Sequence, residues 1–250
     1  MSIKKYIPNL LTCGNIACGL AGIIVVMSTP AETLGMPWLM YLIGGALVFD
    51  FLDGFAARLL KAYSPIGKEL DSLADMVSFG VLPGLILFQL LNSLLPSIGF
   101  DRGMLSLNGL LPYVSFLIPI FSAIRLAKFN IDTRQSDSFI GLPTPANTLF
   151  ILGVAYSYTQ KSSFLNPFIN PISISIICFV LSYLLIAEIP LIALKFKNTS
   201  WAANKFRYLL IISAITLFLI LNFNAIPIII ILYIILSLVN RKGIDTTSSK

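Results

Sequence analysis

The sequence predicts an all-α integral membrane protein with about eight transmembrane helices and both termini in the cytoplasm. Of its 250 residues, 57% are hydrophobic and 11% are charged, and the mean hydropathy of +0.90 excludes an ordinary soluble domain. Apolar stretches of about 17 to 25 residues, the length that crosses the hydrocarbon of a bilayer, recur along the chain. Basic residues gather at the ends of these stretches. Together these observations indicate a polytopic membrane protein.

Each apolar stretch is expected to form one helix. The first follows Lys4 and Lys5, and we interpret it as a retained helix because no small-residue cleavage pattern follows it. The fifth stretch is shorter than the others. The stretches run over residues 10–28, 36–58, 69–95, 107–130, 146–160, 171–194, 206–222 and 225–240. Residues 1–240 are therefore predicted to be one transmembrane domain, and 241–250 a flexible cytoplasmic tail.

The distribution of positive charge supports this topology. With both termini inside, only Arg102 and Lys161 of the 17 basic residues fall in outside loops, as expected when basic residues remain in the cytoplasm. The scattered basic residues also argue against nucleic acid as a partner. Small residues in two regions, 14–22 and 44–45, are expected to allow close contact between helices.

Some chemistries are excluded by composition. The chain has no histidine, which excludes a Ser-His-Asp triad and a histidine-based metallopeptidase. Its three cysteines form no C-x-x-C pair and suggest neither a zinc site nor a disulfide framework. A general base must therefore be a carboxylate, lysine, tyrosine or cysteine.

Four aspartates gather between residues 50 and 75, in an otherwise apolar sequence. Helical spacing places one set on a single helix face: Asp50, Asp53, Gly54 and Ala57. A second face carries Gly67, Asp71 and Asp75. Ser64-Pro65 between them predicts a turn. Two facing carboxylate pairs repel each other unless cations lie among them, and oxygen-only ligands favour Mg²⁺ or Mn²⁺, with Ca²⁺ less favoured.

This spacing, D-x2-D-G-x2-A-R-x8-G-x3-D-x3-D, resembles the signature of the CDP-alcohol phosphotransferase family, with every position filled. The resemblance implies two divalent cations held by Asp50, Asp53, Asp71 and Asp75. It also implies that Asp75 accepts the proton of the attacking alcohol. The implied CDP-binding residues are Gly54, Ala57, Arg58, Ser64 and Gly67. Two of these have structural alternatives: Arg58 as an interfacial anchor and Ser64 as a turn residue.

The stretch 122–147 is similar to the corresponding loop of phosphatidylserine synthases in this family, and so is the N-terminal segment around Asn15. The similarity implies transfer of a phosphatidyl group from CDP-diacylglycerol to L-serine at a cytoplasmic membrane face, by an enzyme that is commonly a homodimer. Candidate acceptor-site residues are Asn15, Arg125, Lys128, Asn130 and Arg134. Arg125 could instead pair with Asp132.

Two alternatives stay open at this point. The same chemistry could use glycerol 3-phosphate or inositol phosphate as the acceptor, because the aspartates do not select the alcohol. A cation transporter would also place carboxylates within a membrane, although it would need them along a path through both leaflets.

Overall fold

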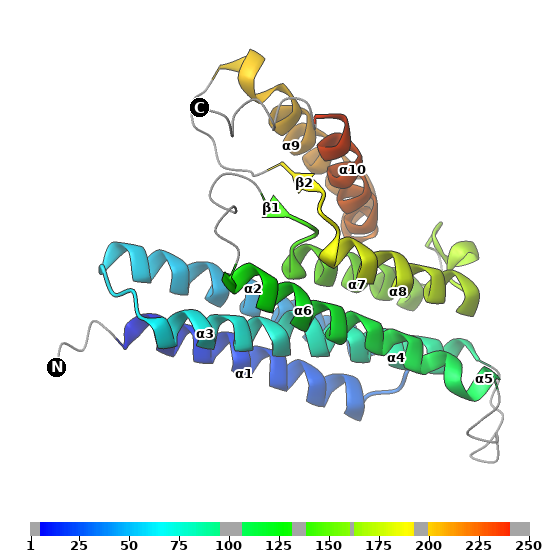
Figure 1. The fold of residues 1–250 in the computed structure, drawn as a ribbon. Coiled ribbons are helices and arrows are strands. Elements are labelled where there is room, and N and C mark those ends of the chain that lie inside the picture. Colours follow the sequence, from blue (N-terminus) through cyan, green and yellow to red (C-terminus); the bar gives the residue numbers. More distant parts are fainter. Residues whose placement is uncertain (1–5, 96–106, 132–138, 161–162, 193–199, 241–250) are drawn as a thin grey trace.

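The chain forms a bundle of helices against which a separate helical hairpin packs at an angle (Figure 1). The computed structural model describes residues 6–95, 107–131, 139–160, 163–192 and 200–240. The helices are α1 (Ile7–Ser28), α2 (Met36–Leu59), α3 (Pro65–Asp75), α4 (Leu82–Leu94), α5 (Leu107–Leu110), α6 (Leu117–Ile131), α7 (Thr144–Thr159), α8 (Pro171–Ile186), α9 (Trp201–Leu221) and α10 (Ala225–Val239). Short 3-10 helices cover Leu111–Phe116, Asn166–Phe168 and Asn222–Asn224.

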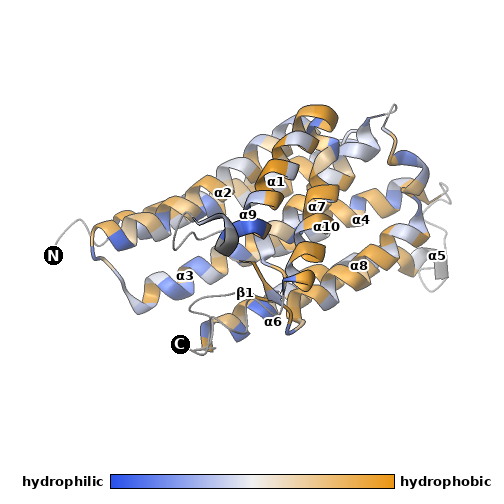
Figure 2. Cartoon of the chain, turned by 90° about the horizontal axis from the view of Figure 1, so that it is seen from above, coloured by the Kyte–Doolittle hydropathy of each residue, from blue (hydrophilic) through white to orange (hydrophobic). Residues whose placement is uncertain are grey.

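Within the described ranges, five stretches are long and apolar enough to span a membrane: Ile7–Ser28, Met36–Leu59, Pro65–Leu94, Leu111–Ile131 and Asn204–Val239. Most helices are apolar along their length (Figure 2). The last stretch is the α9–α10 hairpin, whereas α7 and α8 have 16 residues each, slightly fewer than a perpendicular crossing needs. The protein is thus a helical integral membrane protein, and the eight crossings and the placement of its termini stay predictions.

A tight turn joins the two helices that carry the aspartates. The Ser64 hydroxyl caps α3 by accepting a hydrogen bond from the Gly67 N–H at 3.0 Å, and Pro65 occupies the first turn, where no N–H is needed. Lys61 adopts a positive φ of 49° as α2 ends. These features reverse the chain between α2 and α3, as the Ser-Pro pair predicted.

Helix α3 runs into a π-helix, Met76–Val81, and then into α4 without a break. The expected stretch 69–95 therefore begins earlier, at Pro65. The π-helix is buried at Ser78, Phe79 and Gly80, where α1, α6 and α7 pack around it. Because a π-turn inserts a residue into the helix, it changes the face that the following side chains present.

The sequence expectations fail at the end of α8. The stretch 171–194 was expected to be helical throughout, but α8 ends at Ile186 and Ala187 is extended. Pro190 explains this end, since the residue before a proline is disfavoured in a helix. The chain then forms β2 (Pro190–Leu191), which pairs antiparallel with β1 (Phe139–Ile140). Apart from this pair of two-residue strands, the regular structure of the described residues is helical, as the sequence predicted.

Glycines allow α1 to approach its neighbours closely. A Cβ on Gly19 would lie 2.9 Å from the Ser78 Cα and would overlap the Ser78 hydroxyl. A Cβ on Gly14 would lie 2.9 Å from the Phe49 ring. The expectation of close packing therefore holds for this region. In the second region it holds for Gly45, whose added Cβ would lie 3.2 Å from the Cys18 sulfur, and fails for Gly44, where an added Cβ meets nothing within 4 Å.

We expect Gly19→Ala to lower the free energy of unfolding by about 1–3 kcal/mol, the usual cost of overpacking, because backbone atoms of the π-helix must move. Gly44→Ala is the matched control, since its methyl group enters open space and alanine favours a helix. Thermal unfolding in detergent measures both variants. Equal melting temperatures for the two variants would contradict this account of the α1 contact.

The C-terminal hairpin contacts the bundle through α10, which packs on α7 and on β2. Asn222 turns the chain between α9 and α10 with a positive φ of 51°, and the two helices lie side by side (Figure 1). The hairpin has a small core of its own at Ile192, Leu210 and Leu236. Tyr233 packs against both this core and the main core of the bundle, so it marks the junction of the two units.

Candidate active site

Three of the motif aspartates converge between α2 and α3. Carboxylate oxygens of Asp50, Asp53 and Asp71 all lie within 4.8 Å of one another. The charges that act on Asp50 and Asp71 are those of other aspartates. Helical spacing therefore predicted the two faces correctly, and the Ser64-Pro65 turn brings them together.

Helix α1 contributes to this cluster through a residue that the motif does not contain. The Thr12 hydroxyl donates to Asp53 Oδ2 at 2.7 Å and also lies 3.0 Å from the Pro8 carbonyl. Both Thr12 and Asp53 are buried. Thr12 thus fixes the orientation of one carboxylate of the cluster.

If the site acts on a CDP-alcohol, as the motif resemblance implies, Thr12→Val should lower kcat/KM for this substrate about tenfold, because the hydrogen bond that it removes goes to a charged group and contributes about 1.5–3 kcal/mol. Thr12→Ser keeps the hydroxyl and should stay close to wild type. Steady-state kinetics of the two variants measures the difference. Similar kinetics for valine and serine would show that the Thr12–Asp53 contact has no role in the site.

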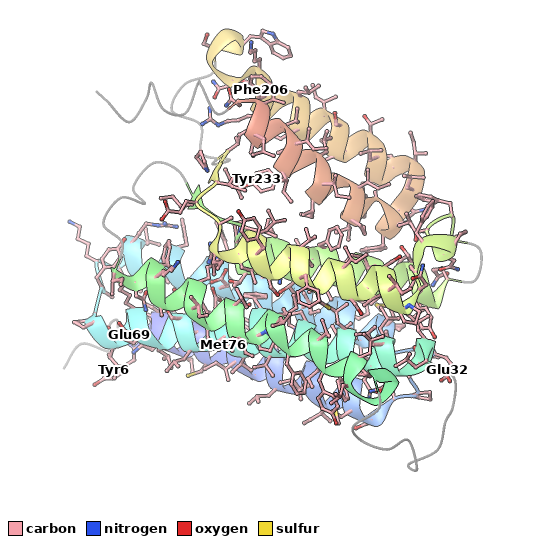
Figure 3. All side chains as sticks on the ribbon, turned by 45° about the vertical axis from the view of Figure 1, so that its right-hand side comes forward. Tyr6, Glu32, Glu69, Met76, Phe206 and Tyr233 are labelled. Atoms are coloured by element: carbon pink, nitrogen blue, oxygen red, sulfur yellow. The ribbon has the colours of Figure 1, made fainter. Side chains whose placement is uncertain are left out.

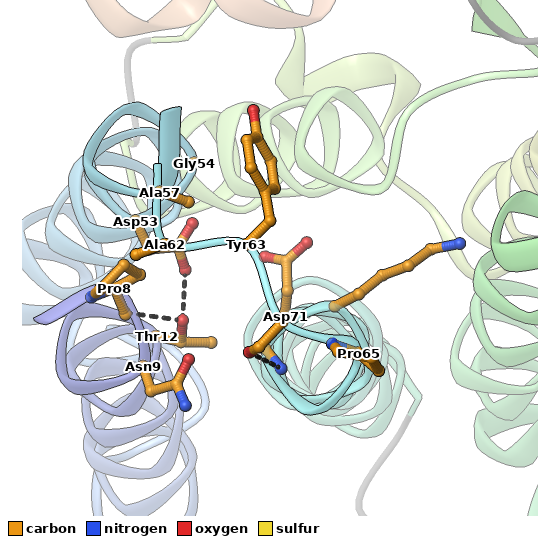
Figure 4. Close-up of a pocket in the computed structure, with 13 residues that line it drawn as sticks. Pro8, Asn9, Thr12, Asp53, Gly54, Ala57, Ala62, Tyr63, Pro65 and Asp71 are labelled. Atoms are coloured by element: carbon orange, nitrogen blue, oxygen red, sulfur yellow. Dashed lines mark hydrogen bonds between the residues drawn. The ribbon is translucent and has the colours of Figure 1, made fainter. Parts of the chain in front are cut away.

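A pocket of about 480 Å³ opens between α1, α2 and α3 (Figure 4). Asp53 and Asp71 extend into it from facing helices (Figure 4). A Cβ on Gly54 would meet no atom within 4 Å, so this glycine keeps backbone accessible to a ligand. The lining residues are Pro8, Asn9, Thr12, Asp53, Gly54, Ala57, Ala62, Tyr63, Ser64, Pro65, Gly67, Lys68 and Asp71.

The pocket gathers four of the five residues expected to bind CDP: Gly54, Ala57, Ser64 and Gly67. The fifth, Arg58, is exposed on the last turn of α2 and is not among the lining residues. The sequence analysis did not single out four of the other lining residues: Asn9, Thr12, Tyr63 and Lys68. For Asn9 and Thr12, the sequence did hold a signal, because polar residues at the start of the first apolar stretch are unusual in a membrane-spanning helix.

Asp75 lies one turn beyond Asp71, at the junction of α3 and the π-helix. The Asn15 amide nitrogen donates to Asp75 Oδ1 at 3.4 Å, and the Asn15 carbonyl accepts from the Ser78 hydroxyl at 2.9 Å. Asp75 also interacts electrostatically with Asp50, Asp71 and Arg125. Asn15 is completely buried, so α1 fixes the carboxylate that faces the interior of the bundle.

The expected acceptor residues separate into different environments. Arg125 is buried on α6, whereas Lys128 is exposed on the same helix. Asn130 joins α6 to α3: its carbonyl accepts from the Lys68 ammonium at 2.7 Å, and its amide nitrogen donates to Glu69 at 3.2 Å. Arg134, together with Asp132, the alternative partner of Arg125, lies outside the described residues.

Several buried polar atoms near the acceptor candidates have no hydrogen-bond partner among the described residues. They include the Arg125 Nε, the Ser122 hydroxyl, the Thr144 hydroxyl and both amide atoms of Asn147. Buried polar groups are almost always paired, and an unpaired one is costly in a low-dielectric interior. Sequence reasoning missed Ser122, Thr144 and Asn147 because only their burial distinguishes them.

Comparison with known proteins assigns the chain to a family. The model of the CDP-alcohol phosphatidyltransferase family matches residues 5–182, which hold all four motif aspartates. The chain belongs to the CDP-alcohol phosphatidyltransferase family. It is therefore an enzyme, and the aspartate cluster lies within the matched range.

Three relatives in the CDP-alcohol phosphatidyltransferase family share the name CDP-diacylglycerol–serine O-phosphatidyltransferase. The Helicobacter pylori (strain 26695) protein is 32% identical over 93% of this chain and 89% of its own length. The Bacillus subtilis protein is 32% identical over 74% of this chain and 89% of its own. A Saccharomyces cerevisiae protein is 40% identical over 44% of this chain and 38% of its own. The chain is thus similar to two bacterial relatives and to one yeast relative.

The residues of this CDP-alcohol phosphatidyltransferase site fit divalent cations. The donor set consists of carboxylate oxygens, which suits hard ions such as Mg²⁺ or Mn²⁺. Three carboxylates lie within 4.8 Å of one another, and their mutual repulsion favours a cation among them. Asp50 and Asp71 are only partly buried, so an ion can enter from the pocket.

Proposed function

We propose that the chain transfers the phosphatidyl group of CDP-diacylglycerol to the hydroxyl of L-serine, giving phosphatidylserine and CMP. The observation that carries the proposal is the aspartate cluster that faces a pocket built around small residues of the family motif. The shared name of relatives that cover most of the chain supports CDP-diacylglycerol and serine as substrates.

The reaction is a substitution at the phosphorus attached to diacylglycerol. The serine hydroxyl oxygen forms a bond to this phosphorus, the bond to the CMP oxygen breaks, and CMP leaves. Asp75 accepts the hydroxyl proton during the attack. Its carboxylate is suited to this role because Asn15 orients one oxygen, and because it is at the end of the cluster that faces the bundle interior. A weak base can act here only if deprotonation accompanies attack.

The pocket residues hold the donor. Gly54, Ala57 and Gly67 leave room for the nucleotide to lie against backbone, and Ser64 lines the same wall. Lys68 also lines the pocket, and its ammonium, which donates to the Asn130 carbonyl at 2.7 Å, would supply a positive charge that attracts a diphosphate. Arg58 would have to turn toward the pocket to contact a phosphate, since its side chain is exposed.

Two divalent cations, Mg²⁺ or Mn²⁺, complete the proposed site. Asp50, Asp53 and Asp71 would hold one ion, and Asp71 and Asp75 the other. When bound, such ions supply positive charge that stabilises the leaving phosphate and orients the diphosphate. Thr12 fixes the Asp53 oxygen, which limits the rearrangement required of this ligand.

Arg125 would bind the serine carboxylate. A buried guanidinium without a hydrogen-bond partner on its Nε suits a carboxylate ligand, and its charge acts on Asp75. Serine bound in this way places its hydroxyl near the proposed base.

In the membrane, we propose eight crossings with both termini and the active site on the cytoplasmic side, and a homodimeric assembly.

Release of CMP from CDP-diacylglycerol by the purified protein in detergent with Mn²⁺ tests the acceptor. Serine, glycerol 3-phosphate, inositol phosphate and no acceptor are supplied in parallel. We expect release that depends on serine. Release only with a phosphorylated alcohol would keep the chemistry and overturn serine as the acceptor, and no release with any acceptor would overturn the proposed function.

A further inference from the structure

The pocket beside the aspartates has an aromatic side chain at its edge. Among the described residues that line the pocket, Tyr63 is the only aromatic one. Tyr63 is 73% exposed, whereas the preceding residue, Ala62, is buried. Figure 4 shows the Tyr63 ring beside the pocket, between Ala57 of α2 and Asp71 of α3. The ring therefore offers an open aromatic face next to the space that a ligand would fill.

The backbone on both sides of this ring is fixed by hydrogen bonds. Before the ring, the Ala62 N–H donates to the Ala57 carbonyl at 2.9 Å. After it, the Ser64 hydroxyl accepts from the Gly67 N–H at 3.0 Å and so caps α3. Tyr63 is thus held at a defined place at the edge of the pocket, which lowers the entropy lost when a ligand packs against it.

The wall of the pocket next to Tyr63 is built from small residues. Gly54, Ala57 and Gly67 line it, and a Cβ added to Gly54 would meet no atom within 4 Å. The pocket volume of about 480 Å³ lies in the range of small-molecule sites. These residues therefore leave space in which a flat ring of a ligand can lie against Tyr63.

The direction of the donor in this pocket follows from the membrane. The proposed site places the diphosphate at Asp53 and Asp71, which extend into the pocket (Figure 4). The acyl chains of the donor stay in the hydrocarbon of the bilayer. Met36–Leu59 and Pro65–Leu94 are each long and apolar enough to span a membrane, so the connection between them lies at a membrane surface. The nucleoside then extends from the diphosphate toward this connection, which carries Tyr63.

We propose that the Tyr63 ring stacks on the nucleobase of the donor and so contributes to recognition of the cytidine nucleotide. The proposal rests on the proposed function, in which this pocket holds CDP-diacylglycerol. Every nucleobase has a π-face, and stacking on an aromatic side chain strengthens its binding. The family motif passes from Arg58 to Gly67 without specifying the residue at position 63. The stacking contact is therefore a feature of this chain that the motif does not predict.

An exposed tyrosine at a membrane surface can also act as an interfacial anchor, because its ring lies readily among lipid headgroups. An anchor contacts lipid, whereas a stacking surface changes the affinity for the base alone. Tyr6 provides the comparison. It is 54% exposed, it is not among the described lining residues, and it lies at the same end of the bundle as Glu69 of α3 (Figure 3).

The test compares the binding of two soluble probes, CMP and ribose 5-phosphate, to the full-length protein in detergent with Mn²⁺. Ribose 5-phosphate carries the sugar and the phosphate without the base, and isothermal titration calorimetry measures both affinities. We expect Tyr63→Ala to weaken CMP binding about tenfold, the effect of removing one base–aromatic stack, and to leave ribose 5-phosphate binding unchanged. Tyr63→Phe keeps the ring and should bind CMP as wild type does, and so should Tyr6→Ala.

Three results would overturn the stacking role of Tyr63. They are an unchanged CMP affinity in Tyr63→Ala, an equal loss of affinity for both probes, and a loss in Tyr63→Phe as large as in Tyr63→Ala. An equal loss for both probes would show that the substitution disturbs the turn instead of removing a contact with the base. Wild-type protein that binds CMP no more tightly than ribose 5-phosphate would overturn the cytidine donor, and with it the proposed function.

Discussion

Asp75→Asn should lower serine-dependent CMP release about 10²–10⁴-fold, the range that a positioned general base contributes. Asparagine has nearly the same size as aspartate and can still accept the hydrogen bond from Asn15, but it cannot take the hydroxyl proton. The other three aspartates remain in place. Binding of CDP-diacylglycerol, followed by protection against thermal unfolding, should therefore change much less than turnover.

Glu69→Gln is the control for Asp75→Asn. Glu69 is an exposed carboxylate on the same helix, and a glutamine oxygen can still accept from the Asn130 amide that now bonds to it. Its activity should stay within about twofold of wild type, since exposed polar contacts contribute little. If Asp75→Asn retained more than a tenth of wild-type turnover, Asp75 would not be the base.

The second large effect is expected for Asp71→Asn. Asp71 is the residue of α3 that joins the cluster on α2, and the proposed site uses it for both ions. Replacing a residue that only hydrogen-bonds to a metal ligand typically lowers metal affinity or activity about 10–100-fold. We expect a larger loss of activity for Asp71→Asn, together with a higher Mn²⁺ concentration at half-maximal rate. Titration with Mn²⁺ and with Mg²⁺ measures both.

The metal dependence can be checked without turnover. Mn²⁺ binding measured by electron paramagnetic resonance should weaken in Asp71→Asn and stay unchanged in Glu69→Gln. An Asp71→Asn variant with a wild-type Mn²⁺ titration would contradict the assignment of this carboxylate as a shared ligand. Addition of EDTA to the wild-type protein should stop CMP release, and excess Mn²⁺ should restore it.

The sequence predicted the aspartate site because the relevant information is local. Spacing of three or four residues places carboxylates on one face of a helix, and Ser64-Pro65 determines where the chain turns. The contribution of α1 is not local. Nothing in the spacing shows that Thr12 bonds to Asp53 from 41 residues away, because that contact depends on how α1 packs between its neighbours.

The packing of the glycines could not be predicted from the sequence either. Gly19 and Gly44 look equivalent within apolar stretches, yet one meets the π-helix and the other faces open space. Hydropathy likewise predicted a helix to residue 194, but it does not register the extended backbone that Pro190 favours. Asn130 stays a candidate acceptor residue by similarity, and the structure adds contacts from α6 to α3 that the sequence did not indicate.

Transfer of isotopically labelled serine into lipid tests the central claim most directly. Purified protein is incubated with CDP-diacylglycerol, labelled serine and Mn²⁺, and CMP and extracted lipid are measured from the same reaction. We predict one labelled phosphatidylserine for each CMP, with neither product when EDTA is present or when Asp75 is replaced by Asn. CMP release without labelled lipid, or labelled lipid formed at an undiminished rate by Asp75→Asn, would contradict the account.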